Sequence, residues 1–206
     1  LSANLKFDGS MVMQIHGDGA VKLLVVECDA DLKMRATAKL NSDYTLPQQA
    51  SLQELVHTRG KGRFVITLDP RNKLPGQQAY QGIVALEGEN VAAIIENYMQ
   101  SSEQLQTKLW LAANGTQVRG LLLQKLPNSG GSGALSADTD EAWNRAVILG
   151  STLKQQELLD TDIDTLRTRI FLEENLRLFD TAQPSFHCAC NREKVSGMLK
   201  MLGQTE

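Results

Sequence analysis

A glycine- and serine-rich run at residues 128–134, NSGGSGA, divides this chain of 206 residues into two parts of different character. Runs of this composition behave as flexible connectors. Before it, residues 1–127 alternate apolar and polar side chains in short segments, which is the period of β-strands. After it, apolar side chains recur every three or four positions, which is the period of helices. The sequence therefore predicts a strand-rich first domain followed by a helical region.

Seven segments of the first part have the composition and spacing of strands. They are residues 11–15, 21–26, 34–40, 64–68, 80–86, 108–111 and 118–126. Gly17-Asp18-Gly19 is a strong turn signal, so the first two segments should form a hairpin. Asp69-Pro70 should end the fourth strand, because proline restricts the residue before it and cannot donate to a sheet.

Two helices should interrupt these strands. Ser51-Leu52-Gln53-Glu54 has the pattern of a capping box, which marks a helix start. Asn90 can cap a second helix, which carries one continuous apolar face. That face consists of Val91, Ile94, Ile95, Tyr98 and Met99. Strands that pair with each other and are then covered by helices indicate the α+β class.

Three groups of apolar residues in the second part each mark one face of a helix. They are Trp143, Ala146 and Val147; Ile163, Leu166 and Ile170; and Val195, Met198, Leu199 and Leu202. Thr161 or Asp162 can cap the second helix, and Asn191 the third. A short strand is predicted at residues 176–179. The last helix should either dock on the helices before it or remain unpacked, because a helix of about three turns is marginal alone.

Charge and hydropathy exclude several classes of protein. The 21 basic and 24 acidic residues give a net charge of −3, whereas nucleic-acid binders usually carry a basic excess. The longest aliphatic runs, residues 23–26 and 91–95, are far shorter than the roughly 20 residues that span a bilayer. We therefore expect neither nucleic acid nor membrane as a partner. Because the first residue is Leu1, we also expect the chain to be part of a longer protein.

The chain has three cysteines, Cys28, Cys188 and Cys190. An odd number argues against a disulfide-stapled secreted domain and favours a reducing, cytoplasmic compartment. Cys28 ends a strand-like run, and we interpret it as a small buried hydrophobe. His16 and His57 flank a turn and a short helix, and we interpret both as structural.

Cys188-Ala189-Cys190 is the sharpest chemical signal. Two thiolates at this spacing can point at one soft cation, and structural zinc takes four ligands. The chain offers only half of such a four-cysteine site, so zinc should bind it weakly or not at all. Two unrelated cysteines at the edge of a small domain are an equally good interpretation at this point.

Sequence motifs of common enzymes are missing. The chain contains no phosphate-binding Gly-x-x-x-x-Gly-Lys-Ser/Thr, no dinucleotide-binding Gly-x-Gly-x-x-Gly and no hydrolase Gly-x-Ser-x-Gly. Residues 59–64, RGKGRF, lack the further aromatic side chains that an RNA-binding strand uses for stacking. We interpret them as a glycine turn that enters a strand.

Six motifs in order resemble the bacterial thirty-three-kilodalton heat-shock chaperone, a family of redox-regulated holdases. They are Leu5-Lys6-Phe7-Asp8-Gly9; Gln14-x-x-Gly17-Asp18-Gly19; Tyr80-Gln81-Gly82-x-Val84-x-Leu86-Glu87-Gly88; Ser102-Glu103-Gln104-Leu105; Gly120-x-Leu122-Leu123-Gln124-x-Leu126-Pro127; and Phe186-x-Cys188-x-Cys190-x-Arg192-Glu193. Each motif alone is weak, but their order is specific. The resemblance runs from Leu5 to about Leu202.

The resemblance implies an ATP-independent cytoplasmic chaperone, a binding protein and not an enzyme, that holds unfolding client proteins under heat and oxidative stress. It implies zinc held by four cysteines in the reduced full-length protein, of which Cys188 and Cys190 would be two. Oxidation would form disulfides at Cys188 and Cys190 and release zinc, and the active form would be a homodimer. The implied domains are an α+β core (1–127), a connector (128–134), a helical linker (135–182) and a partial redox-switch domain (183–206).

Two departures from the family pattern concern the ends of the chain. The family has a helical segment before the position of Leu5 and a later Cys-x-x-Cys, and this sequence shows neither. A thiol oxidoreductase that uses Cys188 and Cys190 as a redox couple is the alternative function. A zinc-dependent nucleic-acid binder is a third interpretation, which the charge disfavours.

Overall fold

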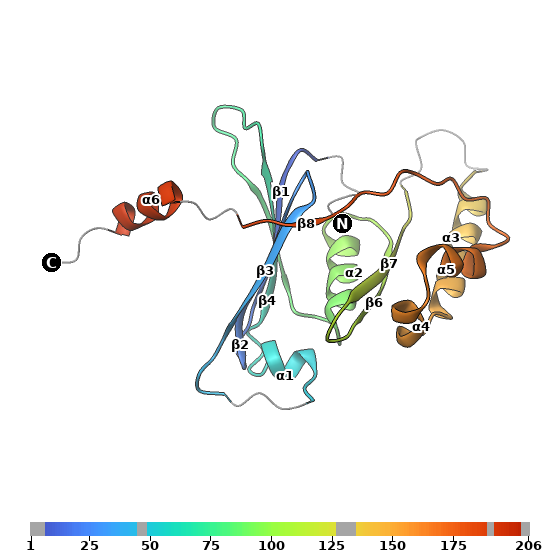
Figure 1. Ribbon diagram of the computed structural model, residues 1–206, viewed down its shortest axis with the longest axis horizontal. Helices are drawn as coiled ribbons and strands as arrows, with labels where there is room; N and C mark the ends of the chain where they lie inside the picture. Colours follow the sequence, from blue (N-terminus) through green and yellow to red (C-terminus); the bar gives the residue numbers. More distant parts are fainter. Residues whose placement is uncertain (1–6, 45–48, 127–134, 189–191, 203–206) are drawn as a thin grey trace.

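A computed structural model describes residues 7–44, 49–126, 135–188 and 192–202. Its largest unit is a six-stranded sheet, seen nearly edge-on in the centre of Figure 1. In spatial order its strands are β5 (Tyr80–Ala85), β4 (Arg63–Pro70), β1 (Gly9–His16), β2 (Val21–Asp29), β3 (Lys33–Leu40) and β8 (Ser185–Phe186). All neighbours run antiparallel except β3 and β8, which run parallel. The α+β class predicted from the sequence is confirmed.

The predicted hairpin of β1 and β2 turns at Gly17. A Cβ atom at this glycine would lie 2.1 Å from the carbonyl oxygen of Val21, so only glycine fits the turn. The carboxylate of Asp18 accepts the backbone N–H groups of Arg59 and Lys61 at 3.1 and 2.8 Å. These bonds tie the turn to the glycine-containing loop before β4. That loop leads into β4 at Arg63, as we predicted for residues 59–64.

One face of the sheet is covered by α2 (Val91–Ser101), and the main core lies between them (Figure 1). The Asn90 side chain accepts the N–H of Ala93 and begins the helix, as predicted. Ile94 and Tyr98 are 1% and 2% exposed, and the Tyr98 ring meets the Phe64 ring edge-on at 6.1 Å. The shorter α1 (Leu52–Val56) begins with the predicted capping box.

A second, smaller core lies on the far side of a two-stranded sheet formed by β6 (Thr107–Ala113) and β7 (Val118–Gln124). This hairpin separates α2 from three helices of the second part (Figure 1). They are α3 (Leu135–Ser151), α4 (Gln155–Asp160) and α5 (Ile163–Phe171). Their apolar side chains pack on Trp110 and Ala112 of β6.

Our sequence analysis missed α4. Its N-cap position is Lys154, whose side chain supplies no capping hydrogen bond, so the usual start signal is missing. Leu158 and Leu159 were the available signal, because both are buried against the hairpin at 6% exposure. The Asp162 carboxylate caps α5 by accepting the N–H of Thr165 at 2.9 Å. Of the two predicted capping residues, Thr161 and Asp162, Asp162 therefore caps this helix.

The predicted strand at residues 176–179 is wrong. These residues form no strand, and Phe179 is 76% exposed. The chain pairs six residues later instead, where β8 reaches the edge of β3. A strand needs a neighbouring edge that supplies hydrogen bonds, and residues 176–179 have none beside them within the described chain.

The last helix, α6 (Arg192–Leu202), does not dock on the helices before it. It lies at the opposite end of the molecule from α3–α5 (Figure 1), and Val195 and Leu199 are 43% and 60% exposed. The docked alternative is therefore wrong. Its predicted cap, Asn191, and the predicted connector at residues 128–134 lie outside the described residues. The predicted domain boundaries stay predictions.

Candidate functional site: an apolar groove beside the Cys188 segment

An apolar groove of about 410 Å³ lies between the large sheet and the β6–β7 hairpin. The sheet contributes Met11, Met13, Val26, Cys28 and Met34, and Leu32 comes from the turn between β2 and β3. Ile95 of α2 lines the groove as well. The hairpin contributes Leu109, Leu111, Gly120, Leu121 and Leu122 from the opposite side. Pro184, just before β8, lines one end. Among the described residues that line the groove, Cys28 alone has an ionisable side chain, so the groove suits apolar groups and not charged ones.

Strand register explains why these side chains gather. Met11 pairs with Cys28 on β2, and Cys28 pairs with Met34 on β3, so the three form one row across the sheet. Met13 and Val26 lie in the next row on the same face. The row ends at the exposed edge strand, where Met34 is 38% exposed. The groove therefore continues from the buried core to the open edge of the sheet.

Three of the lining residues are methionines, Met11, Met13 and Met34. Methionine is unbranched and polarisable, so it adapts to partners of different shape. Such surfaces are found where a protein binds many unrelated apolar sequences. The arrangement can hold apolar side chains without demanding one particular shape.

Cys188 lies just beyond β8, on the same edge of the sheet. It is exposed, and the Nη1 group of Arg35 on β3 donates to its Sγ at 3.5 Å. Arg35 is itself held by Glu27 on β2, through Nε to Oε2 at 2.6 Å and Nη2 to Oε1 at 3.1 Å. This bidentate pair fixes the guanidinium, so the sulfur contacts a positioned group rather than a mobile side chain. The structure thus links Cys188 to the sheet that forms one wall of the groove.

The second predicted ligand, Cys190, lies outside the described residues, so the structure does not test the predicted pair. Among the residues that are described, no three His, Cys, Asp or Glu side chains gather as a metal site would require. Of the two cysteines that the structure describes, Cys28 and Cys188, only Cys188 belongs to the predicted pair, and its described neighbour is a cation, Arg35. These described residues alone do not supply the set of ligands that zinc needs.

The other sequence candidates have structural roles. His57 ends α1, and its Nδ1 accepts the N–H of Gly62 at 3.1 Å. This hydrogen bond ties the end of α1 to the loop before β4, which is a structural role. Cys28 is half-buried in β2 and lines the groove, so it is less buried than predicted.

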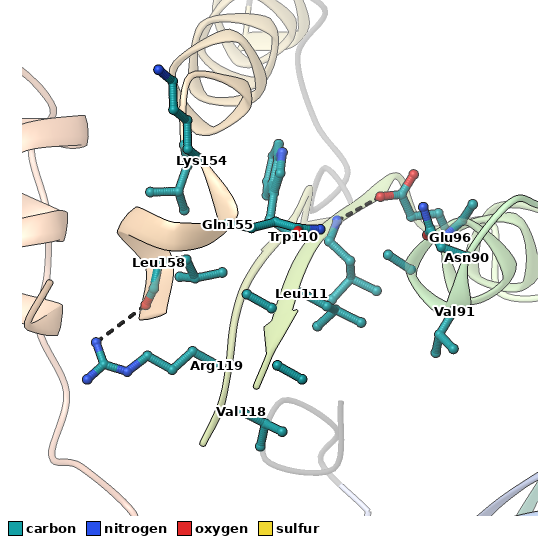
Figure 2. A pocket seen from close by; sticks show the side chains of 16 residues that line it. Asn90, Val91, Glu96, Trp110, Leu111, Val118, Arg119, Lys154, Gln155 and Leu158 are labelled. Atoms are coloured by element: carbon teal, nitrogen blue, oxygen red, sulfur yellow. Dashed lines mark hydrogen bonds between the residues drawn. The ribbon is translucent and has the colours of Figure 1, made fainter. Parts of the chain in front are cut away.

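A second cavity, of about 660 Å³, lies between the start of α2, the hairpin and α4 (Figure 2). Two of its charged side chains, those of Glu96 and Arg119, make internal contacts. Glu96 accepts the N–H of Leu109 at 2.7 Å, and Arg119 donates to the Leu158 carbonyl at 3.4 Å, the two bonds drawn in Figure 2. This cavity therefore lies at the joint between α2, the hairpin and the helical region.

Sequence reasoning did not find the groove. Met11, Met13, Val26 and Met34 occupy alternate positions of three strands, which marks them as facing one side of a sheet. The hairpin that forms the other wall begins more than 70 residues later in the chain, at Thr107. No local pattern shows that these walls meet and leave a cavity.

Fold and site together define an α+β core whose apolar groove adjoins a cysteine-bearing C-terminal segment. The model of the Hsp33 protein family matches residues 1–206, and the chain therefore belongs to this family. A 33 kDa chaperonin of Chromobacterium violaceum is 48% identical over the whole chain, and one of Methylobacillus flagellatus is 46% identical. The chain covers 65% and 66% of these two relatives.

A solved structure shows the same fold. It is the 33 kDa chaperonin (heat shock protein 33 homolog) of Thermotoga maritima, with a TM-score of 0.75 and 18% sequence identity. The match covers 97% of this chain and 67% of that one. No helix among the described residues is both long and apolar enough to cross a membrane.

Proposed function

We propose that the whole protein is an ATP-independent chaperone, a holdase that binds unfolding proteins and prevents their aggregation. The observation that carries this proposal is the match of the Hsp33 family over the entire chain, since the relatives are named as chaperonins. The methionine-lined groove supports it, because a holdase must accept apolar segments of many sequences. In this proposal the protein acts in the cytoplasm and binds its clients without chemical change, so it is not an enzyme.

We further propose that Cys188 and Cys190 regulate this binding when an oxidant such as peroxide converts their thiols to disulfides. Cys188 follows β8 by two residues and contacts Arg35, so a change at the thiols acts directly on the segment at the sheet edge. Thiol oxidation is reversible, which suits a signal that must be switched off when the stress ends. Zinc bound to these thiols in the reduced full-length protein, and dimerisation of the active form, belong to the same proposal and come from the family resemblance.

The alternative, a thiol oxidoreductase, gains no support from the comparisons. Enzymes of that class turn over disulfide substrates, so the two functions are separable in an insulin-reduction assay. We expect no turnover by this protein above the rate of the reductant alone.

The test is light scattering by a heat-labile client protein, with the full-length protein in oxidised and in reduced form and without ATP. We expect the oxidised form to suppress scattering and the reduced form to suppress it much less. A Cys188→Ser/Cys190→Ser variant should lose the response to peroxide, whereas the matched variant Cys28→Ser should keep it. Equal scattering with and without the oxidised protein would refute the holdase. Equal suppression by both redox forms would refute the switch alone.

Sedimentation of the same two forms tests the dimer. Exposed sheet edges associate readily, and we expect the oxidised full-length protein to sediment as a dimer. A monomer at the concentrations that suppress scattering would contradict this part of the proposal.

A further inference from the structure

The outer edge of β3 carries backbone groups that β8 uses only in part. The carbonyl oxygens of Leu32 and Met34 accept the N–H groups of Ser185 and His187, both at 3.0 Å. Alternate residues of a strand direct their backbone groups to the same edge. The N–H and C=O groups of Ala36 and Ala38 therefore point to this edge as well.

No described strand lies beside this part of β3. The pairing with β8 covers only Lys33 and Met34, and residues 36–40 are all exposed. A long exposed edge of this kind is a template for another extended chain. Two residues whose backbone groups point to this edge, Ala36 and Ala38, have small side chains. These would not crowd the side chains of a neighbouring strand at the usual spacing of about 4.8 Å.

The two faces of β3 differ in chemistry. Met34, Ala36, Ala38 and Leu40 lie on the face that forms the groove, since Met34 lines it. Lys33, Arg35, Thr37 and Lys39 lie on the other face. An added strand would therefore place alternate side chains beside an apolar row that leads into the groove, and the others beside basic groups.

We propose that an extended segment of an unfolding polypeptide binds by adding as a strand to the outer edge of β3, in the place that β8 partly occupies. This inference rests on the proposed chaperone function and specifies how the client is bound. Backbone hydrogen bonds supply affinity that does not depend on sequence, as in other cases of strand addition, and the groove accepts apolar side chains. The seated β8 shows that the edge accepts an extended chain of this protein's own sequence.

The same geometry makes β8 a competitor of the client. The segment is held by its pairing with β3, which includes the bonds from Ser185 to Leu32 and from His187 to Met34, and by the contact between Arg35 and Cys188. An event at Cys188 that withdraws this segment would free Leu32 and Met34 and lengthen the available edge. The preferred client segment alternates apolar residues with neutral or acidic ones, because Lys33 and Lys39 would oppose a basic segment.

The first test uses a short synthetic peptide that alternates valine and threonine, together with the same peptide N-methylated on the amides of one edge. N-methylation keeps the side chains and removes the backbone donors. We expect the full-length oxidised protein to bind the first peptide and to bind the methylated one at least tenfold more weakly. Equal binding of both peptides would overturn strand addition, because the side chains alone would then carry the affinity.

Amide hydrogen exchange resolved by residue gives a second readout. The amides of Ala36 and Ala38 should exchange rapidly in the free protein and become protected when the peptide binds. The amides of Arg35, Thr37 and Lys39 point towards β2 and should be protected in both states. Protection that appears only on groove residues, with Ala36 and Ala38 still exchanging rapidly, would place the peptide elsewhere and overturn the proposal.

Two pairs of variants test the edge directly. Ala38→Pro removes an outward donor without touching the bonds to β2, and proline is tolerated on edge strands for this reason. Ala38→Val keeps the donor and serves as its control. Ser185→Pro removes the bond to Leu32, and Ser185→Ala keeps it. We expect Ala38→Pro to weaken peptide binding to the oxidised protein about two- to tenfold, the usual range for one net hydrogen bond. Ser185→Pro should strengthen binding to the reduced protein, in which β8 competes for the edge, by a similar factor.

The outcomes separate the two proposals. The holdase stands, and strand addition is wrong, if two results are found together. The oxidised protein suppresses client scattering, and Ala38→Pro equals Ala38→Val both in this suppression and in peptide binding. If the oxidised protein does not suppress scattering at all, the holdase itself is wrong. If Ala38→Pro turns a dimer into a monomer with unchanged peptide binding, the edge pairs with a second copy of the chain and the client proposal is overturned.

Discussion

Replacing Leu166 by alanine should unfold the helical region while the large sheet stays folded. Leu166 is 6% exposed and belongs to the second core, whose other buried members are Ala112, Leu158, Leu159 and Ile170. Burying one large aliphatic side chain contributes about 1.5–3 kcal/mol, and ordering the helices opposes this gain. A leucine-to-alanine change in a core costs about 2–5 kcal/mol. In so small a core, that loss is comparable with the whole net stability.

Tryptophan fluorescence is the natural assay, because both tryptophans of the chain report on this region. Trp110 packs against the second core, and Trp143 lies in α3. In a urea titration, Leu166→Ala should shift the fluorescence transition to a much lower concentration and leave the circular dichroism of the sheet nearly unchanged. Ile148→Ala is the control, since Ile148 is also aliphatic, lies in α3 and is 67% exposed.

The result that would refute this reasoning is an equal shift of both transitions. The two cores would then unfold as one cooperative unit through the hairpin that they share. An unchanged fluorescence transition would show instead that Leu166 contributes little to the helical region.

Three further predictions concern single side chains. Gly150→Val should destabilise the contact between α3 and the hairpin by about 1–3 kcal/mol, because a Cβ at this position would lie 2.7 Å from Cη2 of Trp110. The urea concentration at which the Trp110 emission shifts measures this loss. Hydrogen bonds from the hydroxyl and N–H of Thr165 lower the pKa of Asp162 in the folded protein. The stability that its cap gives α5 is therefore fully present above the pKa of an unfolded aspartate, and it is lost as the pH falls through the lower pKa of the folded state. Acid titration followed by circular dichroism should therefore show a helix loss that Asp162→Asn, which still caps but does not titrate, lacks. Cys28→Ser should leave the peroxide response intact and cost about 1 kcal/mol of stability, because the Cys28 thiol donates one long hydrogen bond, to the Asp29 carbonyl at 3.5 Å. A lost response to peroxide would show that this thiol takes part in the switch.

Local patterns in the sequence were enough to predict much of the first domain. The hairpin of β1 and β2, the capping box of α1 and the apolar face of α2 all depend on residues within a few positions of one another. Such features follow from backbone geometry and from the satisfaction of helix-end amides, which are properties of the local chain. The α+β class followed from their order along the chain.

The Cys188-x-Cys190 motif was also visible in the sequence, but its surroundings were not. Arg35, which contacts the Cys188 sulfur, is 153 residues away along the chain. Its position depends on the pair that it makes with Glu27 on β2, and hence on the register of two neighbouring strands.

The tertiary structure decided where the last strand forms and where the groove lies. Residues 176–179 were predicted as a strand, yet the chain pairs at Ser185–Phe186, because within the described residues it meets the outer edge of β3 there. The groove likewise exists because strand register aligns Met11, Cys28 and Met34 opposite a hairpin from a distant part of the chain. A side-chain pattern expresses a local preference, whereas a sheet edge or a cavity wall requires a partner that only the folded chain brings into place.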